Sequence, residues 1–159
     1  MDTIEEDFRD WLAADDTPVT GIAALVGLNV YFTAIPTKLD GAFIGTKWPQ
    51  NDRMHTTNKT GGPVLAKCEV KCCFKGADPV LDYSKAKALA QAVKARVNSA
   101  DGTWLMGNTK IFSLSIDDRV EGEGGEGTKD KDFLFHAGQS SGIQEVIVPV
   151  AFHYWGTNN

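Results

Sequence analysis

Two stretches of alternating side chains limit most strongly what this chain can fold into. Between Val64 and Phe74, and again between Val146 and Tyr154, apolar or small side chains occupy every second position. Successive side chains of a strand point to opposite faces of a sheet, so each stretch predicts a strand with one buried face. The segment between them carries apolar residues at helical spacing, namely Ala86, Leu89, Ala90, Val93 and Val97. This order of patterns predicts a sheet covered by helices.

The N-terminal third of the chain predicts two further helices. A capping box begins at Thr3, and apolar residues then recur at helical spacing as far as Leu12. A second, short helix is expected to start after Thr20 as its cap and to end at Gly27. We expect the Ala-rich helix to be capped by Ser84.

Shorter strands and long loops complete the expected fold. Strands are predicted over residues 29–35, 42–45, 104–106, 110–116 and 133–135. Pro149 lacks an N–H, which indicates an edge position or a bulge in the last strand. Residues 46–62 and the Glu/Gly-rich tip at 121–130 are expected to be exposed loops. The prediction is one α+β domain over residues 1–159, a mixed and mainly antiparallel sheet packed against two helices with long exposed loops.

Composition restricts the classes of protein to consider. The chain has 159 residues and is 42% hydrophobic, which suits one soluble domain. No apolar run approaches the roughly 20 residues of a membrane helix, and the N-terminus is acidic where a secretion signal would be basic. Three clustered cysteines do not form a disulfide framework, so we expect synthesis in a reducing cytoplasm.

Charge is distributed in blocks along the chain. The formal net charge of −5 argues against duplex nucleic acid as the main partner. Residues 1–40 carry a net −6, residues 41–100 a net +6, and residues 101–159 a net −5. If folding keeps these blocks apart, identical subunits could associate head to tail. The alternative is that folding interleaves them into a mixed, solvated surface.

Two sequence motifs resemble catalytic ones without their required context. Residues 122–127 spell G-x-G-x-x-G, but no helix follows, and Glu123 and Glu126 would repel a phosphate. Residues 138–142 spell G-x-S-x-G around Ser140, but a strand follows where the hydrolase elbow requires a helix. We interpret both as loops or turns made of small residues.

The cysteines and histidines do not form a predicted metal site. On an extended strand Cys68 and Cys72 lie about 13 Å apart, and Cys72 and Cys73 point to opposite faces. Three ligands on this strand therefore cannot converge on one ion. We expect Cys68 and Cys72 to be small core residues, and the three histidines to be structural or exposed. No cofactor is predicted.

The four tryptophans have different expected roles. Trp11 and Trp104 are expected in the core. Trp48, beside Pro49 in the first long loop, is either an interface anchor or a staple that packs onto its own domain. The candidate interface residues are Trp48, Arg53, Lys59, Glu121, Glu123 and Glu126.

The order of elements resembles the tail-completion, or tail-terminator, proteins of long-tailed bacteriophages. The residues that carry this resemblance are Ala24-Leu25-Val26-Gly27, then Val30-Tyr31 and Ile35-Pro36, then Tyr83-Ser84 opening the Ala-rich helix, and the closing strand Val148 to Trp155. Both long loops depart from the family by their length, so the family's loop contacts cannot be transferred.

The resemblance implies a virion protein without enzymatic activity. It would form a ring, usually of six subunits, at the head-proximal end of the tail tube, where it ends tube growth and joins tail to head. Its partners would be copies of itself, the tail tube protein and a neck or head-closure protein, with DNA only as passing cargo and no membrane. The protein would be made in the bacterial host cytoplasm.

Three other functions stay open at this point. The same fold could serve as a head-closure or neck adaptor protein. A small hydrolase or redox enzyme would have to use Ser140 or Cys73. A monomeric ligand-binding domain would need an enclosed pocket.

Overall fold

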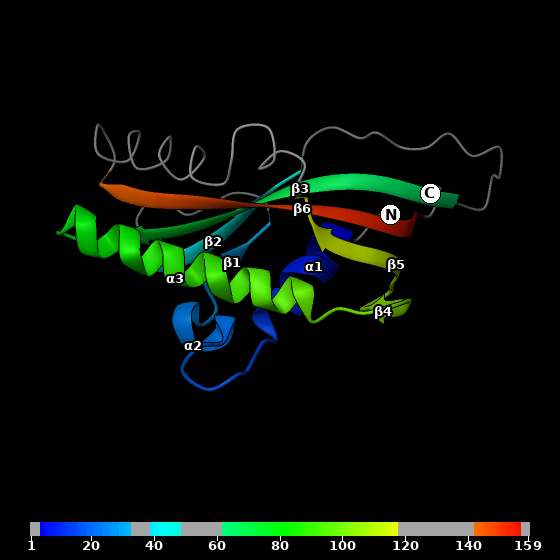
Figure 1. The fold of residues 1–159 in the computed structure, drawn as a ribbon, viewed down its shortest axis with the longest axis horizontal. Coiled ribbons are helices and arrows are strands. Elements are labelled where there is room, and N and C mark those ends of the chain that lie inside the picture. The colour runs from blue at the N-terminus through cyan, green and yellow to red at the C-terminus, as the bar shows by residue number, and fades with distance from the viewer. Residues whose placement is uncertain (1–3, 33–38, 49–61, 118–141, 157–159) are drawn as a thin grey trace.

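A six-stranded sheet with helices on one face makes up the body of the protein. The computed structural model describes residues 4–32, 39–48, 62–117 and 142–156 (Figure 1). The strands are β1 (Val30–Tyr31), β2 (Gly41–Lys47), β3 (Gly62–Lys75), β4 (Trp104–Met106), β5 (Thr109–Ile116) and β6 (Ile143–Gly156). Their order in the sheet is β1-β2-β3-β6-β5-β4, and every neighbouring pair is antiparallel except β1 with β2. The predicted mixed, mainly antiparallel α+β fold is confirmed.

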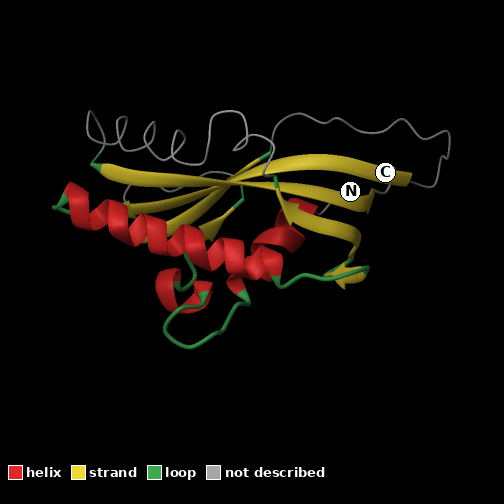
Figure 2. Cartoon of the chain, in the orientation of Figure 1, coloured by secondary structure: helices red, strands yellow, loops and turns green. Residues whose placement is uncertain are grey.

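The helices form a second layer on one face of this sheet. They are α1 (Ile4–Ala13), α2 (Ile22–Val26) and α3 (Pro79–Asn98). Figure 2 shows all three on the same side of the strands, with α3 running along the length of the sheet. We call the face that the helices cover the inner face, and the other the outer face. Among the described residues, no helix is long and apolar enough to cross a membrane.

The two alternating stretches form the central strands. β3 and β6 pair over 14 residues each, from Gly62 opposite Gly156 to Lys75 opposite Ile143. The side chains predicted for the core do face it: the fully or nearly buried ones include Val64, Cys68, Val70, Cys72, Val146, Val148, Val150, Phe152 and Tyr154. The helical stripe of α3 is buried against them, from Ala86 to Val97. Alternation and helical spacing therefore predicted the core correctly.

The position of Pro149 corrects one prediction. β6 lies between β3 and β5, so Pro149 is in a central strand and not at a sheet edge. Its carbonyl accepts a hydrogen bond from the Asp117 N–H (2.9 Å), so its backbone groups face β5 and not β3. An N–H at position 149 would also point toward β5, just beyond the last residue pair of β5 and β6. Its absence therefore removes no hydrogen bond to β3. The register shift in the sheet lies in β5, between Ile111 and Ser113.

Two helix caps also differ from their predictions. α3 begins five residues before Ser84, at Pro79, because the Asp78 carboxylate accepts hydrogen bonds from the first-turn N–H groups. α2 begins after Gly21, not Thr20, and no side chain of the cap residue bonds to it. Asp15 supplies the missing acceptor from seven residues upstream. The predicted end of α2 at Gly27, in a left-handed conformation (φ 59°), is confirmed.

Several predicted features fall outside the described residues. They are the Thr3 cap, residues 33–35 of the first predicted strand, most of the 46–62 loop, the 121–130 tip, and the 133–135 strand. Trp11 and Trp104, both predicted in the core, lie at its border and are half-buried against it.

Candidate assembly surfaces

An aromatic cluster fixes α1 on the inner face of the sheet. The Phe8 ring packs edge-on against Phe152 of β6 (4.8 Å between centroids), and Trp11 lies against Trp104 of β4 (5.3 Å). The Arg96 guanidinium from α3 covers the Trp11 ring at 4.5 Å and donates to the Trp11 carbonyl at 2.9 Å. Because α1, α3 and the sheet meet in this cluster, the surfaces around it are held rigidly.

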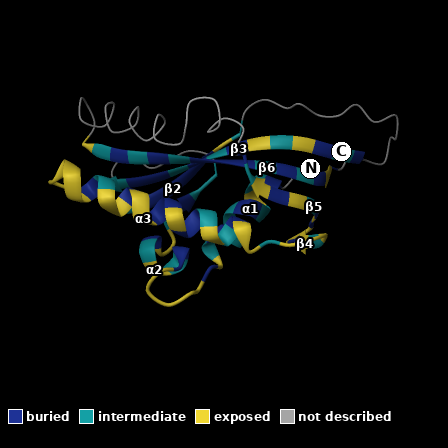
Figure 3. Ribbon diagram, in the orientation of Figure 1, coloured by how far each residue is buried: buried dark blue, intermediate teal, exposed yellow. Residues whose placement is uncertain are grey.

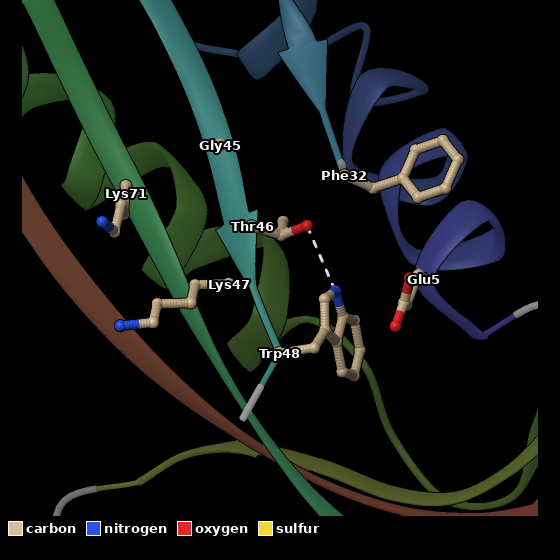
Figure 4. Close-up of a pocket in the computed structure, with 7 residues that line it drawn as sticks. All are labelled: Glu5, Phe32, Gly45, Thr46, Lys47, Trp48 and Lys71. Atoms are coloured by element: carbon tan, nitrogen blue, oxygen red, sulfur yellow. Dashed lines mark hydrogen bonds between the residues drawn. The ribbon is translucent and has the colours of Figure 1, made fainter. Parts of the chain in front are cut away.

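Trp48, a predicted interface residue, is part of this cluster. Its ring lies 5.1 Å from Phe152 and 6.0 Å from Phe8, and its indole N–H donates to the Thr46 hydroxyl at 3.2 Å (Figure 4). These contacts favour the interpretation that Trp48 packs onto its own domain. The ring nevertheless borders an open hollow of about 380 Å³ between α1 and the end of β2.

The hollow beside Trp48 carries charges of both signs. Figure 4 shows Glu5 and Phe32 on one side of β2, and Lys47 and Lys71 on the other. The Lys71 Nζ also lies 3.7 Å from the Glu145 Oε1 on the outer face. A wide hollow of this kind suits contact with a protein surface better than enclosure of a small molecule.

The cysteines are packed as structural residues. Cys68 and Cys72 face the core, and Cys73 is buried on the outer face, opposite Phe43 and Glu145. All three thiols are free. Burial raises the pKa of each thiol well above its ordinary value, and for Cys73 the Glu145 carboxylate adds to this effect. A protonated thiol is a poor nucleophile, so the environment does not activate Cys73.

Of the three histidines and the serine of the G-x-S-x-G motif, the structure describes only His153. His153 lies on the outer face with its ring 5.1 Å from the ring of Phe112. His55, His136 and Ser140 fall outside the described residues. Within the described ranges, no cluster of three or more His, Cys, Asp or Glu side chains could hold a metal ion.

Folding brings the charge blocks together on the outer face. Three lysines of β3 pair with carboxylates of the other two blocks: Lys67 with Asp117 (3.3 Å), Lys71 with Glu145 (3.7 Å) and Lys75 with Asp40 (3.8 Å). On this face, the ion pairs therefore favour the alternative in which folding interleaves the charge blocks into a mixed surface. The Lys75–Asp40 pair is exposed and stabilises the subunit little, whereas Lys67 contacts the buried Asp117 carboxylate. Together the three pairs leave the face mixed in charge.

A second surface, on the far side of α3 from the sheet, was not predicted from the sequence. An apolar groove of about 590 Å³ runs between α3 and the segment that leads into α2. We call it the α2–α3 groove; Val19, Leu25, Ala88, Ala92 and Ala95 are its apolar lining residues. The sequence does contain a signal for it, since these alanines repeat at helical spacing on the side opposite the core stripe.

The structure places few of the predicted interface residues. Only Trp48 lies within the described part of the chain; Arg53, Lys59, Glu121, Glu123 and Glu126 all fall outside it. Their grouping at an interface therefore stays a prediction.

Comparison with known proteins gives one structural relative. No family model matches the chain, and no curated protein matches its sequence significantly. A chain of a solved structure described as "Virion of native gene transfer agent (GTA) particle" has the same fold, with a TM-score of 0.61. The match covers 96% of this chain and 95% of that chain, at 19% sequence identity. At this identity the similarity defines a shared fold over nearly the whole length of both chains.

Proposed function

We propose that this protein is a structural component of a phage-like virion, and that it acts as the tail terminator. In this role it forms a ring at the head-proximal end of the tail tube, ends tube growth and joins the tail to the head. The observation that carries the proposal is the fold shared over 96% of the chain with a chain of a gene transfer agent virion. The order of elements that resembles tail terminators supports the narrower role.

The chemistry of the described residues supports a role in assembly. Burial holds the thiols in their protonated form, and both the hollow beside Trp48 and the α2–α3 groove are open and lie on the surface. A subunit of this kind acts through the shape and charge of its faces. A heterologous contact between identical subunits produces a ring when its rotation closes.

The acidic tip has a proposed place in this ring. Glu121, Glu123 and Glu126 would line the lumen, where negative charge allows DNA to pass without adhering. Arg53 and Lys59 would contact an adjacent ring. Iodide quenching of a fluorophore at Glu123→Cys, compared before and after ring formation, tests the first of these assignments. Weaker quenching is expected in the ring, because a lumen lined with carboxylates repels the iodide anion, and unchanged quenching would contradict the assignment.

Light scattering and binding tests address the function as a whole. We expect the purified protein, alone or mixed with tail tube protein, to form a closed oligomer of about six subunits. It should bind assembled tail tube in preference to portal or adaptor protein. The reverse preference would favour a head-closure or neck adaptor role. A protein that stays monomeric and binds neither partner would contradict both.

A further inference from the structure

The outward side of α3 exposes small apolar side chains beside the α2–α3 groove. Ala88 and Ala95 are exposed there, and neighbouring Ala92 is buried only by the α2 segment. α3 thus carries apolar residues on two opposite sides, the core stripe and these alanines, with polar residues such as Lys87 and Lys94 between them.

Two large apolar side chains on either side of α2 are exposed as well, and one of them, Val19, lines the α2–α3 groove. Val19 is 81% exposed and Leu28, just after α2, is 93% exposed. Val19 also has a φ of +67°, a left-handed conformation that is costly for a β-branched residue. Single exposed apolar residues need no explanation, but Val19 lines an apolar groove.

A separate apolar projection lies at the start of α3. Val80 is 80% exposed and Leu81 is 51% exposed in its first turn. In Figure 1 this turn forms the end of the molecule away from β4, whereas α2 lies below the middle of α3. Figure 3 shows exposed residues along the start of the helix. The chain thus carries a projection and a groove at different places, which a head-to-tail contact between copies requires.

Both places carry charged residues: exposed Asp78 and Lys85 flank the projection, with the Lys85 ammonium 4.5 Å from the Phe74 ring of its own copy, and Asp16 lies beside the groove. Lys85 is exposed one helical turn after Leu81, and Asp16 is exposed between two residues that line the groove, Asp15 and Thr17. If the first turn of α3 enters the groove of another copy, Lys85 comes close to Asp16. Such rim charges orient an encounter more than they strengthen it.

We infer that the α2–α3 groove binds the first turn of α3 from a neighbouring copy, with Val80 and Leu81 as the inserted side chains. This inference rests on the proposed function, because it names the subunit contact of the ring. Insertion covers the outward alanines of one copy and the exposed aliphatic residues of the next. Small alanine side chains in the groove permit the close approach that this packing needs.

Heterotypic cross-linking tests the contact directly. A Leu81→Cys protein and an Ala95→Cys protein, both full-length, are prepared separately, mixed under assembly conditions and oxidised with diamide. We expect a disulfide-linked dimer in the mixture and little in either protein alone. Background from the native thiols is low because all three are buried. The control mixture pairs Leu81→Cys with Ser115→Cys, an exposed position on the outer face.

The outcomes separate this inference from the proposed function. Equal cross-linking of Ala95→Cys with itself would indicate a symmetric contact and overturn the head-to-tail arrangement. If both variants assemble as the wild type does but do not cross-link, the ring is built through another surface and only this inference fails. If the wild type forms no oligomer even with tail tubes, the proposed function itself fails.

A charge placed in the groove provides a second test. We expect Ala95→Glu to weaken self-association at least about tenfold, since it puts an unpaired carboxylate at the centre of the contact. Ser115→Glu adds the same charge on the outer face and should leave association unchanged. Circular dichroism would check that both variants stay folded. Loss of association in Ser115→Glu alone would place the contact on the outer face and contradict the inference.

Discussion

At the scale of single residues, Asp15 organises the turn between α1 and α2. One carboxylate oxygen accepts from the Thr17 hydroxyl at 2.8 Å, and the other accepts from the Ile22 N–H at 3.1 Å. Burial raises the pKa of Asp15, but these hydrogen bonds and the Arg96 charge outweigh it and leave the pKa below its ordinary value. Asp15 and its partner Thr17 also line the α2–α3 groove.

Replacing this carboxylate should lower stability in a pH-dependent way. We expect Asp15→Ala to lower the free energy of unfolding by about 1–3 kcal/mol at pH 7, because buried N–H donors lose a charged acceptor. A depressed folded-state pKa stabilises the protein above the unfolded value of about 3.9 and loses this effect as pH falls through the folded value. Urea denaturation at pH 7 and pH 3 measures both. An equal cost at the two pH values would show that the charge is irrelevant.

The conformation of Val19 predicts a stabilising substitution. Asn tolerates a left-handed backbone far better than Val, and the Val19 side chain is largely exposed. We expect Val19→Asn to raise the free energy of unfolding by about 1 kcal/mol. A lower thermal midpoint for this variant would contradict the strained conformation.

Residue-scale features were the hardest to predict from the sequence. Ser84 and Thr20 are good cap residues, but Asp78 and Asp15 bind the N–H groups instead. Which residue caps a helix depends on where the chain turns into it, and short sequence patterns do not specify that position. Pro149 likewise predicted an edge position or a bulge. It fits a central strand because the pairing with β5 ends beside it, which the sequence pattern does not show.

At the scale of elements, α1 is attached to the β4–β5 hairpin as well as to the core. The Asp7 carboxylate accepts from the Thr109 hydroxyl at 2.6 Å and from the Asn108 N–H at 3.2 Å. Gly107, at the turn, has a φ of +60°, and a Cβ there would lie 2.5 Å from an Asp7 oxygen. The hairpin turn therefore needs glycine for its conformation and for this contact.

Two glycine substitutions separate these requirements. Gly102→Ala, at φ +66° with open space around it, should cost about 1 kcal/mol from backbone strain alone. Gly107→Ala should cost more, about 2–3 kcal/mol, because it also displaces Asp7. Thermal or urea denaturation of both variants measures the difference. Equal costs would mean that the Asp7 contact contributes little.

Elements themselves were predictable where a pattern was long. The alternation in β3 and β6 and the stripe of α3 gave the core residues, because burial of one face imposes a period of two or of 3.6. The order of strands was not predictable, since it depends on contacts between distant segments. The Asp7–Thr109 bond, 102 positions apart in sequence, is one such contact.

At the scale of the whole molecule, the two faces differ in what they offer to a partner. The outer face carries cross-block ion pairs, whereas the helical side carries an apolar groove and an apolar projection. The sequence predicted an interface in the loops and missed this groove, because the prediction for α3 considered only its core stripe and left Ala88, Ala92 and Ala95 without a role. Contact with neighbouring rings through the loops stays a prediction.

Electron microscopy of tail tubes mixed with this protein tests the central claim most directly. The proposed function predicts a ring of extra density at one end of each tube, the end that joins the head, and shorter tubes when the protein is present during tube growth. The Ala95→Glu variant should cap few tubes, and Ser115→Glu should cap them as the wild type does. Tubes that grow to the same lengths with bare ends, at saturating wild-type protein, would contradict the account.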